Sequence, residues 1–151
     1  MSWRARLAEL GIELPQVVPP VAAYVPAART GNLVFTAGQL PMVKGEMAAT
    51  GLVGGPVTAE TAKEQARVCA LNALAAIDAL VGLDSITRVV KVVGFVASAP
   101  GFTGQPGVVN GASELLGEVF GDAGTHARSA VGVAALPLDA PVEVELIVEV
   151  A

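Results

Sequence analysis

The 151-residue sequence has one cysteine, one histidine and few aromatic or charged residues, which make up 4% and 15% of the chain. One cysteine excludes an internal disulfide framework and a multi-cysteine zinc site. Nine basic residues against fourteen acidic ones give a net charge of −5. A nucleic-acid groove is therefore not expected, because binding to phosphates needs clustered cations. The low charge and the 53% hydrophobic content exclude intrinsic disorder.

No uncharged run of the sequence suits a membrane span. The longest, residues 92–113, is interrupted by prolines and glycines between residues 100 and 107, whereas a spanning helix needs about 20 mainly apolar residues. The first six residues are not followed by the apolar stretch of a secretory signal. We therefore expect a cytoplasmic protein with a single domain over 1–151, in which 1–20 form a short helix and an extended lead-in.

The hydrophobic excess comes from alanine and valine rather than from aromatic or long aliphatic side chains. The mean hydropathy of +0.62 is high for a soluble monomer of this length. Since a membrane does not account for it, we expect a subunit interface to cover the extra apolar surface.

Local signals predict two long helices and five strands. Thr58 is the expected N-cap of a helix over 59–81, and Pro106 the expected start of a helix that Gly121 ends. A short helix over 3–10 follows Ser2. Strands are predicted over 21–28, 33–36, 86–97, 129–134 and 142–150. The predicted buried face of the first long helix comprises Ala66, Ala70, Ala73, Leu74, Ile77, Leu80 and Val81.

This order of elements predicts an α+β fold, a two-layer sandwich of a mixed β-sheet with two helices on one face. The other face of the sheet, expected to be rich in valine, is left uncovered. We expect that face to meet another subunit.

Chemical motifs are few. Ligand residues at metal-binding spacing, a phosphate-binding loop and a nucleophile elbow are all missing, so neither a metal nor a cofactor is expected. Arg128 precedes a strand of small apolar residues. It is either a rim arginine paired with a carboxylate or a fork that binds a substrate carboxylate. Glu145, inside the last strand, either faces solvent or acts in an interface cleft as a general acid or base with a raised pKa.

Four further residues have both a structural and a functional interpretation. Gln39 and Asn110 are either hydrogen-bond donors to a ligand or ordinary loop and capping residues. Tyr24 is the only tyrosine, and its hydroxyl needs a partner if it is buried. Cys69 is most simply a small buried hydrophobic residue.

Four segments follow one another in an order and spacing that together carry more information than any one of them. They are Tyr24-Val25 with Gly31-Asn32, the segment Thr36-Ala37-Gly38-Gln39-Leu40-Pro41, Gln65-Ala66-Arg67 with Asn72, and Ala127-Arg128-Ser129 followed by Leu136-Pro137 and Val142-Glu143-Val144-Glu145. In this order they resemble the Rid (YjgF-like) family of reactive-intermediate imine deaminases. The resemblance extends from Tyr24 to Val150.

The resemblance implies a fold similar to trimeric chorismate mutase, with three subunits around a barrel-like core and clefts between neighbours. It also implies hydrolysis of enamines or imines such as 2-aminoacrylate to a 2-keto acid and ammonia. Arg128 would hold the substrate carboxylate and Glu145 would position or activate the attacking water. The cleft would be lined by Tyr24, Ala37, Gly38, Gln39, Asn110, His126 and the backbone near Ala130.

Three positions depart from the family pattern. Ala37 stands where typical deaminating members have Ser, Ala130 where they have Cys, and His126 where they have Pro. The 96–110 segment and the N-terminal lead are also longer. The cleft is thus less polar but gains an imidazole, which is either a rim residue or a group that assists near neutral pH. These changes argue for a different or larger substrate, or for binding without turnover.

Two alternatives to the deaminase stay open. One is a non-catalytic homotrimer that binds a small carboxylate metabolite in the same cleft. The other is an endoribonuclease, an activity sometimes attached to the family. The negative charge disfavours it, because three chains would carry −15 and repel phosphate.

Overall fold

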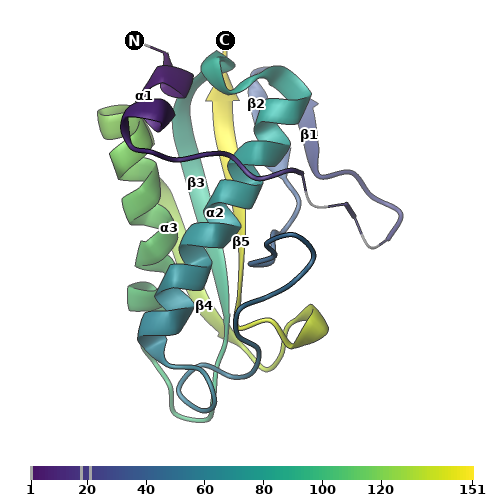
Figure 1. The fold of residues 1–151 in the computed structure, drawn as a ribbon, viewed down its shortest axis with the longest axis vertical. Coiled ribbons are helices and arrows are strands. Elements are labelled where there is room, and N and C mark those ends of the chain that lie inside the picture. The colour runs from purple at the N-terminus through teal and green to yellow at the C-terminus, as the bar shows by residue number, and fades with distance from the viewer. Residues whose placement is uncertain (1, 18, 21) are drawn as a thin grey trace.

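The computed structural model describes residues 2–17, 19–20 and 22–151 as one five-stranded sheet with two long helices packed on it (Figure 1). The strand order is β1-β2-β5-β3-β4. Only β3 and β4 are parallel, joined by a helical crossover, so the sheet is mixed. The elements are α1 (Trp3–Glu9), β1 (Ala27–Thr30), β2 (Leu33–Thr36), α2 (Ala59–Val81), β3 (Ile86–Ala97), α3 (Gln105–Phe120), β4 (Ala127–Val133) and β5 (Val142–Val150).

The predicted fold class is confirmed: α2 and α3 cover the same face of the sheet, and α2 crosses in front of β3 and β5 in Figure 1. The described residues include three short 3-10 turns that the sequence did not predict, over Leu83–Ser85, Gly121–Gly124 and Pro137–Asp139. No helix of the described residues is long and apolar enough to cross a bilayer.

The ends of α2 lie where the sequence predicts them. Thr58 has extended backbone angles, and its hydroxyl oxygen accepts a hydrogen bond from the Thr61 amide at 3.1 Å. Gly82, at φ 82°, ends the helix in a conformation that favours glycine. The Ser2 cap of α1 is also present, accepting from the Ala5 amide.

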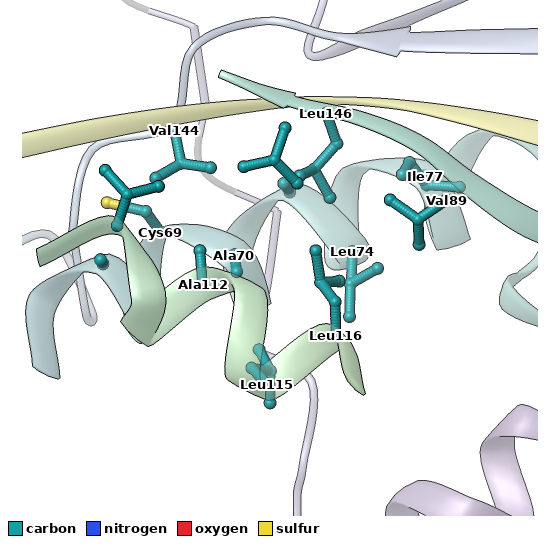
Figure 2. Close-up of a cluster of buried hydrophobic side chains, with 14 of the residues drawn as sticks. Cys69, Ala70, Leu74, Ile77, Val89, Ala112, Leu115, Leu116, Val144 and Leu146 are labelled. Atoms are coloured by element: carbon teal, nitrogen blue, oxygen red, sulfur yellow. The ribbon is translucent and has the colours of Figure 1, made fainter. Parts of the chain in front are cut away.

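Small side chains let the two layers approach closely. Ala66, Ala70 and Ala73 of α2 are fully buried, and Figure 2 shows Cys69, Ala70 and Leu74 packed with residues of β5 and α3. Leu80, predicted to lie in the core, is instead 46% exposed. The fully buried face of α2 therefore ends at Ile77, one turn earlier than predicted.

The two edge strands differ from the prediction at both ends: β1 is Ala27–Thr30 rather than 21–28, and β4 is Ala127–Val133 rather than 129–134. β1 begins at Ala27 rather than at residue 21, and Val21 itself lies outside the described residues. The two-residue turn after Thr30 sets the register Ala27↔Thr36, so β1 has no partner before Ala27. β4 begins at Ala127 rather than 129, because it pairs with β3 from Lys91↔Ala127 onward. Arg128 is thus inside the strand.

The uncovered face of the sheet, called here the open face, is less rich in valine than predicted. The buried valines of β5 point toward the helices, and the alternate positions carry glutamates. The side chains of the open face include Phe35, Val93, Phe95, Val131, Ile147, Glu143 and Glu145. Phe35 and Val131 are 40% and 44% exposed, so a subunit interface on this face stays our prediction.

Candidate functional site

Arg128 is held between β4 and α3. Its Nη1 donates to Asn110 Oδ1 at 2.7 Å and to Ser113 Oγ at 3.3 Å, and its Nη2 donates to the Pro106 carbonyl oxygen at 3.4 Å. Asn110 and Ser113 are three residues apart on α3 and so lie on one face of that helix. We call Arg128, Asn110, Ser113 and His126 the arginine cluster.

The guanidinium is oriented by neutral partners and not by a carboxylate. None of the four ion pairs among the described residues involves Arg128, so the rim-arginine interpretation has no partner there. Both hydrogens of Nη1 are used. In the described part of the chain, Nε–H and the second hydrogen of Nη2 have no acceptor. These two donors form the side-on fork that matches a carboxylate.

His126 belongs to the same cluster. Its Nε2 lies 2.9 Å from Ser113 Oγ and its Nδ1 lies 2.6 Å from the Gly124 carbonyl oxygen. The ring is half-buried. The structure therefore places His126 against a residue that contacts Arg128 and not on an isolated rim.

A second group of polar side chains lies on the open face. Glu143 and Glu145 are half-buried and two residues apart on β5. The Glu143 carboxyl lies directly over Gly38, where an added Cβ would be 2.7 Å from its carboxyl carbon. Burial, and next the charge of Glu145, raise the pKa of Glu143. We call Glu143, Glu145 and the 37–39 segment the carboxylate cluster.

The 37–39 segment is fixed beside β5 by its backbone. The Gln39 amide donates to the Val144 carbonyl oxygen at 2.8 Å and the Val144 amide donates back at 3.0 Å. The Gln39 side chain is only 5% exposed, and its amide nitrogen donates to the Ala37 carbonyl oxygen at 3.4 Å. The Gln39 amide is thus buried in one chain, and its part in lining a ligand cleft stays our prediction.

Tyr24 and Ala130, two further predicted site residues, lie in different parts of the molecule. Tyr24 precedes β1 and is 46% exposed, so its hydroxyl is not a buried group that requires a partner. Ala130 is two residues after Arg128 on β4, pairs with Gly94 and faces the same side of the sheet as Arg128.

The alternation of the sheet separates the two clusters within one chain. Val93 pairs with Glu145 on one side and with Ser129 on the other. Glu145 and Ser129 therefore share a face, and Arg128, one residue before Ser129, faces the opposite side. A site that contains both Arg128 and Glu145 needs a second copy of the chain.

Two residues of these clusters were missed from the sequence. Glu143 stands in the same Val-Glu-Val-Glu alternation as Glu145, and that repetition was a usable signal. Ser113 follows Asn110 by three residues on the same helix face, which could have linked it to Arg128 once Asn110 was chosen.

Neither a metal site nor a reactive thiol emerges from the described residues. No group of three His, Cys, Asp or Glu side chains among them could hold a metal ion. Cys69 is fully buried, as predicted, and burial raises its pKa well above the ordinary value. A hollow of about 570 Å³ between α1, residues 11–15 and Asp78 lies away from both clusters.

Comparisons with known proteins cover nearly the whole chain. Residues 15–150 match the family model described as endoribonuclease L-PSP. Protein TCP17 of Trypanosoma cruzi is 44% identical over 147 residues, which cover 96% of this chain and 92% of that protein.

Solved structures agree with this result. Protein Atu1372 of Agrobacterium tumefaciens, whose function is unknown, is 48% identical with a TM-score of 0.90, covering 99% of this chain and 92% of its own. The YjgF gene product of E. coli is 30% identical with a TM-score of 0.62, covering 90% and 93%. E. coli TdcF, solved with bound serine, is 27% identical with a TM-score of 0.64, covering 91% and 93%.

Proposed function

Because the chain belongs to the YjgF-like family, whose model is described as endoribonuclease L-PSP, we propose that it hydrolyses small 2-imino acids to 2-keto acids and ammonia. The observation that carries the proposal is the Arg128 guanidinium, held on one edge by Asn110 and Ser113 with a two-donor fork left open on the other. A bidentate contact of this kind selects a carboxylate. TdcF was solved with serine, a ligand that also bears an α-carboxylate.

The carboxylate cluster supplies the proton chemistry in this proposal. With the substrate carboxylate on Arg128, an ionised Glu145 removes a proton from a water that attacks the imine carbon. The carbon–oxygen bond forms as the C=N electron pair moves to nitrogen, which takes a proton from solvent to give a carbinolamine. Glu145 then passes the proton it took from water to the amine nitrogen, the carbon–nitrogen bond breaks, and ammonia leaves as the hydroxyl loses its proton to solvent and becomes the keto group. Such acid–base assistance contributes about 10²–10⁴-fold.

The reaction requires a neighbouring copy, because one chain presents Arg128 and Glu145 on opposite faces of its sheet. Two features support this requirement. Arg128 lies on β4, which is an edge strand, and Glu145 lies on the open face, where Phe35 and Val131 are partly exposed. A homotrimer in which the β4 side of one subunit meets the open face of the next brings the clusters together, and we propose this assembly, acting in the cytoplasm.

The test generates 2-imino acids in situ with an amino-acid oxidase and follows keto acid release against buffer alone. Arg128→Met should abolish the acceleration, since it removes the fork. The matched control is Arg67→Met, because Arg67 is paired with Glu118 on the outer surface of the helices at 3.4 Å. No acceleration by the unaltered protein would refute the deaminase.

The same protein preparation decides between the alternatives. If pyruvate binds to the unaltered protein and to Arg67→Met but not to Arg128→Met, while no imine is turned over, the protein is a carboxylate-binding homotrimer. The alanines at positions 37 and 130, which replace the family's Ser and Cys, favour that second candidate. Cleavage of single-stranded RNA would instead support the activity in the family description, against the net charge of −5.

A further inference from the structure

The contacts of His126 give this residue a role that the family pattern does not supply. We propose that His126 is a positioning residue, which fixes the Ser113 hydroxyl so that Ser113 and Asn110 hold the Arg128 guanidinium in its carboxylate-binding orientation. The inference rests on the proposed function only in taking Arg128 as the ligand-binding group.

The hydrogen-bond partners of the ring determine its tautomer. Nδ1 lies 2.6 Å from the Gly124 carbonyl oxygen, and a carbonyl oxygen can only accept, so Nδ1 carries the hydrogen. In the neutral ring Nε2 is then an acceptor. The Ser113 hydroxyl, 2.9 Å away, donates its single hydrogen to Nε2.

This arrangement settles the orientation of Ser113. A serine inside a helix ordinarily turns its hydroxyl toward a carbonyl oxygen of the preceding turn. With the hydrogen committed to His126, the oxygen presents its lone pairs to the strand side of α3. One of them receives the Nη1–H of Arg128 at 3.3 Å.

The chain of contacts determines which edge of Arg128 stays free. Ser113 and Asn110 together occupy both hydrogens of Nη1, so the guanidinium cannot rotate without losing one of them. The Nε and Nη2 edge is then left for a ligand. Without His126, the contact between Ser113 and Arg128 is lost more often. The Nε and Nη2 donors of Arg128 then spend less time in the orientation that binds a carboxylate.

The tautomer can be tested on the unaltered protein by 15N NMR of the imidazole. His126 is the only histidine of the chain, so both imidazole nitrogen signals belong to it, and only Nδ1 and Nε2 have to be told apart. We expect a protonated Nδ1 and an unprotonated Nε2, the tautomer that free histidine disfavours. Ser113→Ala should shift the Nε2 signal. An Nε2–H tautomer would overturn the proposal.

Binding of pyruvate then tests the positioning role. His126→Asn keeps a donor at the Nδ1 position but loses the contact with Ser113, whereas His126→Gln keeps an acceptor at the Nε2 position. We expect His126→Asn and Ser113→Ala each to raise the Kd for pyruvate about three- to tenfold, as loss of one hydrogen bond does. His126→Gln should retain most of the affinity, and Thr125→Ala, at an exposed neighbouring position, should change nothing.

Two further results separate a positioning role from a merely structural one. The double variant His126→Asn/Ser113→Ala should bind no worse than either single variant, because both remove the same contact. If imines are turned over, KM should rise while kcat changes little. An unchanged Kd in His126→Asn, or additive effects in the double variant, would overturn the proposal.

The proposed function and this inference fail in different ways. If Arg128→Met leaves the affinity for pyruvate unchanged, Arg128 is not the ligand-binding group and both fall. If Arg128→Met abolishes binding while His126→Asn does not weaken it, only the role of His126 is wrong.

Discussion

The close contact between α2 and α3 at Gly111 makes the sharpest prediction for stability. A Cβ added to Gly111 would lie 2.9 Å from the Lys63 carbonyl carbon, and closer still to its oxygen, whereas ordinary contacts begin at 3.4 Å. The obstacle is backbone, so it cannot rotate away. Gly111→Ala must therefore push the two helices apart by more than about 0.5 Å.

The expected cost follows from two opposing effects. Overpacking costs typically 1–3 kcal/mol, and a rigid backbone obstacle places this site near the upper end. Alanine also gains about 1 kcal/mol over glycine inside a helix. The net change is a loss of about 2 kcal/mol. At this chain length that lowers Tm by about 4–8 °C, since 1 kcal/mol shifts Tm by roughly 2–4 °C.

Gly117→Ala is the matched control in the same helix. Nothing lies within 4 Å of a Cβ added there. Only the higher helix propensity of alanine then affects stability, so Tm should rise by about 2–4 °C. Thermal unfolding followed by circular dichroism at one fixed protomer concentration measures both variants. Equal stability of Gly111→Ala and Gly117→Ala would refute the reasoning, because it would mean that the helices do not meet at Gly111.

Three further predictions concern buried groups. The raised pKa of Glu143 means that the folded protein binds this proton more tightly than the unfolded chain, whose value is 4.5. The free energy of unfolding should fall as pH rises from 4.5 through the folded pKa. In Glu143→Gln, the free energy of unfolding measured by urea titration should not show this fall. A difference in that free energy between the two proteins that stays the same at every pH would contradict the prediction. The thiol of Cys69 should react with a thiol reagent only as the protein unfolds, because it is fully buried; immediate labelling of the folded protein would refute this. Asn72→Ala should cost about 1–3 kcal/mol in urea unfolding, because the Asn72 amide donates to two carbonyl oxygens of the 40–42 segment; an unchanged midpoint would show that these bonds contribute nothing.

The sequence predicted best those elements whose ends carry a local signal. The helix over 59–81 has the cap Thr58 and the stop Gly82, and both of its ends were right. The strands over 86–97 and 142–150 were also right. The edge strands were not, because β1 and β4 end where their partners cease to pair. Those limits depend on register, which no local pattern of side chains records.

The candidate site was also predicted only in part from local sequence signals. Arg128 and Glu145 stand out in the sequence as charged residues beside apolar strands. That they face opposite sides of the sheet depends on the pairing of three strands through Val93. The contact of Ser113 with both His126 and Arg128 depends on where α3 lies over β4. A serine in a helix gives no hint of that position.

The small residues that dominate the composition also determine the geometry of the arginine cluster. A Cβ on Gly94 of β3 would overlap the Val109 side chain of α3, so α3 rests closer to the sheet at this point than a larger residue allows. Gly111 permits the same close approach toward α2, and it lies between the two residues of α3 that hold Arg128. The Arg128 guanidinium can donate to Asn110 Oδ1 at 2.7 Å only while α3 stays at this distance from the sheet. Gly111→Ala should therefore weaken pyruvate binding as well as stability, whereas Gly117→Ala, which leaves α3 in place, should affect stability alone.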